Sequence, residues 1–196
     1  MKLVLATNNE HKIREIKSIM IGLDVQFLTA TDFPNFPDPH ETGETLEDNA
    51  RIKALEFCRA TGLPALADDS GLEVDYLHGA PGVLSARWAG PGCTFADNNR
   101  KLLKLLEGVP EQQRTARFRC VAGLALGVDD VHLFEGVVEG VITSDLRGRE
   151  GFGYDPVFFF PELGKTFAEI SEQEKNKYSH RGRAFRKTAE FLRNLA

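Results

Sequence analysis

Short apolar runs alternate with stretches of helical periodicity in the first third of the chain, and this alternation limits the possible folds more than any other feature. Residues 2–7 read as a short buried strand that ends in a polar cluster, after which Ile13, Ile16 and Met20 recur at helical spacing. A second apolar run follows at 25–28. This order predicts parallel strands in one sheet, because parallel neighbours need a crossover connection that is usually a helix.

The next segments continue the pattern up to an abrupt acidic sequence. Residues 45–60 have helical spacing with Gly62 just past their end as a stop, and residues 63–67 read as a buried strand. The strand leads directly into residues 68–71, Asp-Asp-Ser-Gly, which we interpret as a turn at the strand end. Three prolines within 34–39 predict an irregular loop before the helix.

The second half of the chain predicts an antiparallel addition to the sheet. Residues 98–106 have helical spacing, apolar residues alternate over 114–126, and a turn at 127–130 leads into a strand at 131–138. Parallel units followed by a hairpin predict an α/β fold with a mixed twisted sheet and flanking helices. The remaining predicted elements are a glycine-rich loop at 151–156, a strand at 157–160, a capping box at 171–174, and a final amphipathic helix carrying Phe185, Ala189, Leu192 and Leu195.

Composition fits a single domain over residues 1–196, since a chain of this length with 42% hydrophobic residues buries a substantial core. The net charge of −5 argues against a protein that coats nucleic acid, which needs a basic surface to displace counterions. Cys58, Cys93 and Cys120 show no disulfide or zinc spacing, and the N-terminus has no secretory leader. The apolar runs are shorter than the ~20 residues that span a bilayer. We therefore expect a cytoplasmic protein that enters no membrane.

The Asp68-Asp69 pair is the strongest chemical signal in the sequence. Adjacent carboxylates after a buried strand repel each other unless a cation or a donor compensates them. Carboxylate oxygens suit Mg²⁺, which takes one or two carboxylates beside phosphates and water. The sequence has no Asp-x-Asp, which disfavours an aspartyl-phosphate mechanism. Ser70 lacks the Gly-x-Ser-x-Gly setting of a nucleophile, so we interpret it as a ligand contact. The acidic first turn of a helix explains Glu44, Glu47 and Asp48.

Two polar segments are candidates for phosphate or base contacts. The segment from Thr7 to Lys12 lies between a strand and a helix start, where backbone N–H groups and the helix dipole favour an anion. Taken alone, it is better explained as an ordinary capped turn. The second segment is basic, and charge runs of this kind are usually solvated faces. It contains Lys175, Lys177, His180 and Arg181.

Two common nucleotide-binding motifs are excluded. A Walker loop ending at Gly164-Lys165-Thr166 would need a glycine where Phe159 stands. The glycine-rich loop at 151–156 has Pro156 in place of the third glycine of a dinucleotide fingerprint.

Short motifs lie at residues 5–12, 41–43, 49–54, 67–71, 79–82, 152–156 and 179–182. In this order they resemble the motifs of the inosine triphosphate pyrophosphatase family, and the resemblance spans essentially the whole chain. One departure is His11, which precedes Lys12 where the family often has glycine. The resemblance implies an elongated mixed α/β fold with two lobes around a substrate cleft, and a homodimer.

The resemblance also implies a reaction, the hydrolysis of deaminated purine nucleoside triphosphates (ITP, dITP, XTP) to a monophosphate and pyrophosphate. In this scheme Glu41 and Asp69 hold Mg²⁺, and Asp69 is also the general base. Asp68 either binds the metal or orients Asp69. The implied triphosphate contacts are Thr7, Asn8, Asn9, Glu10, His11, Lys12 and Lys53. The implied base contacts are Phe152, Gly153, Tyr154, Asp155, Lys175, His180 and Arg181.

Two other functions stay open at this point. A related pyrophosphatase of the septum-inhibitor type acts on modified nucleotides with similar metal use, and the Ser179-His180-Arg181 triplet argues against it. A nucleotide- or RNA-binding module without turnover is the second alternative. The acidic charge of the chain and the Asp68-Asp69 pair disfavour it.

Overall fold

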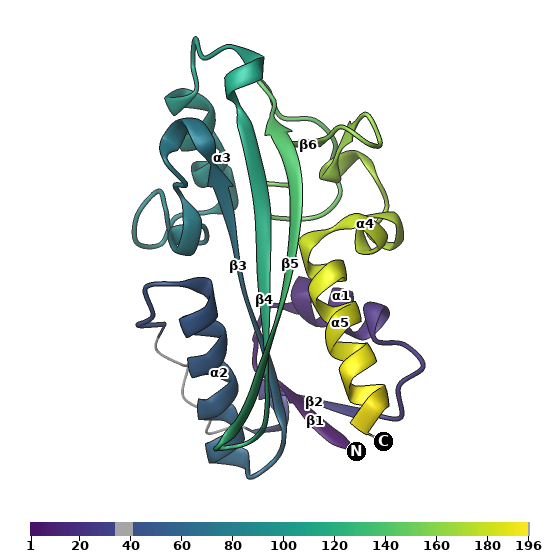
Figure 1. Cartoon of the computed structure of the whole chain (residues 1–196). Helices are drawn as coiled ribbons and strands as arrows, with labels where there is room; N and C mark the ends of the chain where they lie inside the picture. Colours follow the sequence, from purple (N-terminus) through teal and green to yellow (C-terminus); the bar gives the residue numbers. More distant parts are fainter. Residues whose placement is uncertain (34–40, 196) are drawn as a thin grey trace. The chain divides into compact units, whose positions relative to one another are not determined.

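The computed structural model of the protein describes residues 1–33 and 41–195 (Figure 1). The chain divides into two compact units. The first unit comprises Met1–Asp69, Cys120–Gly136 and His180–Ala196, and the second comprises Ser70–Arg119 and Val137–Ser179. The single domain over 1–196 stays a prediction. The loop predicted at 34–39 lies outside the described residues.

One seven-stranded mixed sheet is formed by the described residues, in the order β2-β1-β3-β4-β5-β6-β7. β1 pairs in parallel with β2 and β3, whereas β6 pairs antiparallel with β5 and β7. β4 and β5 are neighbours joined by Val128-Asp129, a connection short enough only for a hairpin. The predicted mixed α/β fold is confirmed. The strands are β1 (Lys2–Leu5), β2 (Gln26–Thr29), β3 (Ala65–Val74), β4 (Thr115–Gly127), β5 (Asp130–Ile142), β6 (Phe158–Phe160) and β7 (Lys165–Thr166).

In the first unit, helices cover both faces of the strands, because side chains alternate in direction along a strand. α1 (Glu10–Ile19) and α5 (His180–Leu195) lie on the same side of the sheet (Figure 1). They share an apolar cluster with Leu3 and Leu5 of β1. α2 (Leu46–Thr61) shares a second cluster with Val4 and Ala6. Burial on both faces explains why this strand is a continuous apolar run.

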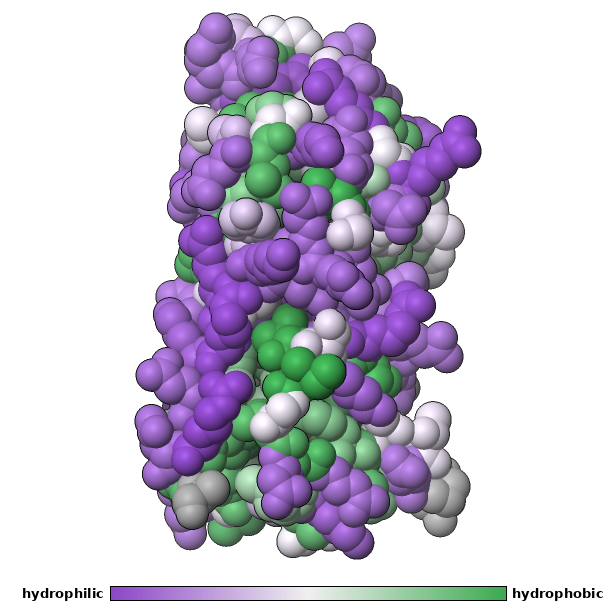
Figure 2. Space-filling view, turned by 90° about the vertical axis from the view of Figure 1, so that its right-hand side faces the viewer, coloured by the Kyte–Doolittle hydropathy of each residue, from purple (hydrophilic) through white to green (hydrophobic). Residues whose placement is uncertain are grey.

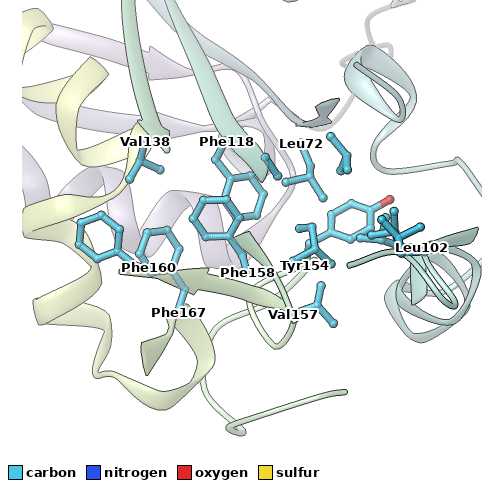
Figure 3. Packing of buried hydrophobic residues seen from close by; sticks show 14 of the residues in the cluster. Leu72, Leu102, Phe118, Val138, Tyr154, Val157, Phe158, Phe160 and Phe167 are labelled. Carbon is cyan, nitrogen blue, oxygen red and sulfur yellow. The ribbon is translucent and has the colours of Figure 1, made fainter. Parts of the chain in front are cut away.

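The second unit has its own core, which is rich in aromatic residues (Figure 3). The Phe158 ring of β6 lies at the centre, with centroid distances of 4.5 Å to Phe118 and 5.2 Å to Phe167. The same cluster contains Tyr154, which precedes β6, and Leu102, which lies in α3 (Phe95–Leu105). This core therefore joins the loop before β6 to α3. The second unit also contains α4 (Glu172–Tyr178).

The acidic sequence at 68–71 is not a turn, and that prediction is wrong. β3 continues through it from Ala65 to Val74. Asp68 and Asp69 are both buried and meet cations from helices of the first unit, which removes the repulsion that disfavours a strand. Gly71 permits close packing, since a Cβ there would lie 2.5 Å from the carbonyl oxygen of Gly82. The strand can therefore continue where the sequence alone suggested an end.

The predicted helices are confirmed, with some ends displaced. Gly62 has φ +67 and ends α2 as expected. α3 begins earlier than predicted because Thr94 and Asp97 form a capping box. The basic segment near the C-terminus is divided between two helices, since Ser179 has an extended backbone between α4 and α5.

The apolar face of the last helix is shorter than predicted. Phe185, Ala189 and Leu192 are buried, but Leu195 is 55% exposed. The surface in Figure 2 is mostly hydrophilic, with a hydrophobic patch in the lower half of the view. In the described part of the chain, no helix has the length and hydrophobicity needed to cross a membrane.

Candidate active site

Asp68 and Asp69 are neighbours in β3, and their side chains point to opposite faces of the strand. Asp68 Oδ2 lies 3.1 Å from Lys12 Nζ of α1 and 3.1 Å from Arg181 Nη2 of α5. Asp69 Oδ1 lies 2.7 Å from Lys53 Nζ of α2. These are the same helices that cover the two faces of β1. The alternation that builds the core therefore also gives each carboxylate its own cations.

Asp68 belongs to a buried ion network. Arg181 is 2% exposed and also donates through Nη1 to Glu15 Oε2 at 2.6 Å. Burial alone would raise the pKa of Asp68, but Lys12, Arg181 and Lys53 hold it well below its usual range. Burial likewise acts to lower the pKa of Arg181, and Asp68 and Glu15 overcome this and raise it. Asp68 is therefore a permanent carboxylate at any physiological pH.

Lys53 organises the opposite face. Its Nζ donates to Asp69 Oδ1 at 2.7 Å, to the Asp68 carbonyl oxygen at 2.7 Å and to Glu41 Oε1 at 3.1 Å. An ammonium group has three N–H donors, so these three acceptors use all of them. Asp69 Oδ2 accepts from Asn49 Nδ2 at 3.3 Å. Burial raises the pKa of Asp69, and Lys53 offsets only part of that rise.

The predicted phosphate loop contains the N-terminus of α1. Asn9 caps the helix, because its Oδ1 accepts from the backbone N–H of His11 at 3.0 Å and of Lys12 at 3.2 Å. Asn9 N in turn donates to Thr7 Oγ1 at 3.2 Å. Three amides expected to face a phosphate, those of Asn9, His11 and Lys12, are thus bonded within the segment. The Lys12 ammonium remains the strongest anion-binding group of this segment.

A further set of predicted residues lies together in the second unit. Lys175 Nζ donates to Asp155 Oδ2 at 2.6 Å, and the same oxygen accepts from Phe152 N at 2.8 Å. Lys175 Nζ also lies 4.6 Å from the centroid of the Phe152 ring. Tyr154 is buried and donates to the Ser85 carbonyl oxygen at 2.9 Å. Gly153, between the two aromatic residues, has φ +66. The loop is therefore held in place by its own aspartate.

The structure does not test the predicted base contacts of His180 and Arg181. His180 is buried at the start of α5. The guanidinium of Arg181 donates to the carboxylates of Asp68 and Glu15. Its base-edge role stays a prediction, as does the ligand contact of half-buried Ser70.

Sequence reasoning missed Glu15 altogether and gave Asn49 no role. Both residues lie one helical turn from a predicted cation, Glu15 three positions after Lys12 and Asn49 four positions before Lys53. Residues at these spacings share a helix face. That spacing was the available signal, but it does not show that the face is buried.

The described residues contain no group of three His, Cys, Asp or Glu side chains arranged to hold a metal. Glu41 and Asp69 nevertheless serve one cation together, since both accept from the Lys53 ammonium. Mg²⁺ usually takes only one or two protein carboxylates beside phosphate oxygens and water. The pair therefore fits a magnesium ion that arrives with a phosphorylated substrate.

Comparisons with known proteins identify the family of the chain. The sequence model of the Ham1 family matches residues 3–191. The chain belongs to the Ham1 family. The family predicted from the sequence motifs is thereby confirmed, since curated relatives in it are dITP/XTP pyrophosphatases.

Three relatives illustrate how completely this Ham1 family member is matched. It is 52% identical over 195 residues to a dITP/XTP pyrophosphatase of Desulforamulus reducens, covering 100% of this chain and 97% of the relative. It is 51% identical over 197 residues to a dITP/XTP pyrophosphatase of Elusimicrobium minutum, covering 98% and 100%. The structure of a HAM1 protein from Coxiella burnetii has a TM-score of 0.92 at 42% identity, over 99% of both chains.

Proposed function

We propose that the protein hydrolyses dITP, XTP and ITP to the nucleoside monophosphate and pyrophosphate, and so removes deaminated purines from the nucleotide pool. The observation that carries this proposal is the pair Asp68 and Asp69. One carboxylate is locked in an ion network and the other is held beside Glu41 and Lys53. The names of the relatives at 51% and 52% identity support the same substrates.

We propose that the triphosphate is bound by Lys12 and Lys53 and by the start of α1. Both ammonium groups lie against the Asp68-Asp69 segment of β3, so they provide positive charge there for a highly anionic substrate. Lys12 is partly exposed, with 19% of its side-chain surface accessible, and can turn toward a phosphate. Lys53 must give up one of its three acceptors to do so.

Glu41 and Asp69 are the proposed magnesium ligands. The bound ion would offset the charge of the triphosphate and polarise the phosphate that water attacks. Asp69 would accept the proton of the attacking water, and its raised pKa makes it a stronger base than an ordinary aspartate. Asp68 is proposed to position Asp69 and Lys12, because its carboxylate already receives Lys12 and Arg181.

Phe152 is the proposed stacking surface for the purine, with Gly153, Tyr154, Asp155 and Lys175 shaping the loop around it. Lys175 and Asp155 are each 2% exposed and paired with each other, so they act first on the loop itself. A site with placed polar groups rejects a base that leaves them unpaired by as much as about 10⁴-fold. His180 and Arg181 stay candidates for the base edge.

The homodimer and the cytoplasmic location are also proposed. The hydrophobic patch in Figure 2 is the kind of surface that a second copy covers. Light scattering after gel filtration measures the mass directly, and a monomer at micromolar concentration would contradict the dimer.

The decisive experiment separates reaction class, base choice and catalytic residue. Purified protein with Mg²⁺ is given ITP, XTP, dITP, GTP and ATP, and pyrophosphate and single phosphate are measured. We expect pyrophosphate from the first three. Asp69→Asn should lower kcat by about 10²–10⁴-fold. Asp129→Asn, an exposed residue in the hairpin turn, is the matched control. Release of single phosphate would overturn the reaction class, and ATP as the best substrate would overturn the base choice. An active Asp69→Asn variant would overturn the catalytic residue.

A further inference from the structure

One face of α3 is directed at the loop that carries Phe152. Phe95 and Asn99 are four positions apart and so lie on the same side of the helix. The Phe95 ring has its centroid 6.1 Å from that of Phe152, at an interplanar angle of 51°. Asn99 Nδ2 donates to the Gly153 carbonyl oxygen at 2.8 Å. Two consecutive residues of the loop are thus contacted from one helix.

Asn99 is poorly explained as a stabilising residue. It is 4% exposed, and its Oδ1 has no hydrogen-bond donor in the described part of the chain. A buried acceptor without a donor destabilises the fold, and asparagine is a weaker helix former than leucine. A leucine of similar size would suit this position better for stability alone. What asparagine adds is the hydrogen bond to Gly153.

That bond holds the backbone of Gly153, the residue that follows Phe152. The Phe152 N–H is held by Asp155, and the carbonyl of the following residue is held by Asn99. Gly153 has φ +66. Because glycine adopts positive and negative φ about equally well, this residue alone would not hold the loop in one conformation. Tyr154, the next residue, packs in the same cluster as Leu102 of α3 (Figure 3). The ring plane of Phe152 therefore depends on α3.

We propose that Asn99 is a positioning residue for purine recognition, and that Phe95 is the aromatic support of Phe152. The proposal rests on the proposed function only in taking Phe152 as the purine-stacking surface. Asn99 acts on the base-binding loop and not on the phosphates. Its loss therefore weakens binding of the nucleoside part of the substrate and leaves binding of the triphosphate part unchanged.

The test uses Asn99→Leu, which removes the hydrogen bond and keeps the size of the side chain. We expect KM for ITP to rise about 3–10-fold, the value of one hydrogen bond, with kcat within about twofold. The inhibition constant of inorganic tripolyphosphate, which has no base, should not change. The melting temperature should stay the same or rise. Phe95→Leu should raise KM in the same direction.

Asn98→Leu is the matched control. Asn98 is buried on the same helix but bonds to the 85–89 segment, through Ser85 O, Ala86 O and Ala89 N. We expect this variant to lower the melting temperature without a selective rise in KM for ITP. A structural role for Asn99 would give the same result as Asn98→Leu and would overturn the proposal.

Two further outcomes overturn it. One is an unchanged KM for ITP in Asn99→Leu. The other is an equal loss of affinity for ITP and tripolyphosphate. Failure of the proposed function is distinguishable, because it appears in the wild type as absence of pyrophosphate release. In that case calorimetric binding of ITP to wild type and Asn99→Leu still measures the positioning role.

Discussion

Asp68 and Asp69 lie on opposite faces of β3, and the two surroundings shift the pKa of the same side chain in opposite directions. On one face, Asp68 is fully enclosed with Lys12 and Arg181, and its pKa is held well below the usual range despite burial. On the other face, Asp69 shares Lys53 with Glu41, and burial raises its pKa. The pKa values of two neighbouring carboxylates in one strand are thus shifted in opposite directions.

The difference shows how one strand provides both a fixed charge and a reactive base. A carboxylate with several buried cations is locked in its ionised form and contributes to folding. A carboxylate that shares one cation keeps a higher proton affinity and an oxygen available to ligands. The comparison predicts that changes on the Asp68 face reduce stability, whereas changes on the Asp69 face alter metal binding and catalysis.

The largest effect is expected for Arg181→Met. It leaves Asp68 and Glu15 buried without their shared guanidinium, and breaking a buried ion pair costs about 3–5 kcal/mol. We expect the upper end, about 5 kcal/mol, measured by urea unfolding. Arg100→Met, which removes a 75% exposed arginine paired with Asp97, should change stability by less than about 1 kcal/mol. Similar losses of stability in the two variants would show that the buried network of Asp68 contributes no more than an exposed ion pair.

Asp68→Asn should cost less, about 3 kcal/mol, because Arg181 keeps Glu15 as a partner. The effect depends on pH. The pKa of Asp68 is lower in the folded protein than in the unfolded chain, where it is about 3.9. Its contribution is therefore complete above that value and declines as pH falls toward the folded-state pKa. The difference in unfolding free energy between wild type and variant should be full at pH 7 and smaller in acid. A difference that does not change with pH would contradict this explanation.

Lys53→Met tests the other face through metal binding. A divalent cation bound by Glu41 and Asp69 competes with Lys53 for the same carboxylates. Removing the ammonium should strengthen Mn²⁺ binding without nucleotide by about tenfold, or 1.4 kcal/mol, measured by calorimetry. Lys187→Met loses the same charge at an exposed position and should leave the affinity unchanged. Weaker binding in Lys53→Met would show that lysine and metal do not compete.

The smallest effect on stability is expected for Asp69→Asn, within about 1 kcal/mol of wild type. Its raised pKa means that the ionised group gains little in the folded state, while Lys53 keeps Glu41 and the Asp68 carbonyl as acceptors. Thermal unfolding of this variant beside Asp68→Asn gives the sharpest comparison. Equal destabilisation of the two would mean that both carboxylates are structural.

Much of the fold could be predicted because local patterns and tertiary packing agree. The apolar run at 3–6 is buried on both faces, and Gly62 ends α2 in the left-handed conformation that glycine favours. The prediction failed at residues 68–71. Local propensity favours a turn for three small polar residues and a glycine, but burial of the two aspartates with cations from distant helices keeps the strand extended.

The candidate site was predictable as a list of residues but not as an arrangement. Motifs identified Lys12, Lys53, Asp68 and Asp69, yet which lysine meets which carboxylate depends on the face of β3 that the carboxylate occupies. Glu15 and Asn99 carried no signal beyond helical spacing, because the burial that gives them a role is produced by residues far away in the chain.

The sequence by itself determined most of the strands, the helices and the family, since periodicity, caps and ordered motifs are local properties of the chain. Tertiary structure alone decided which carboxylate is locked and which is available. Strand alternation sends Asp68 toward α1 and α5 and Asp69 toward α2, and only folding brings Arg181 to Asp68 from 113 positions away. The charge of a buried group depends on its neighbours in space, which no local pattern specifies.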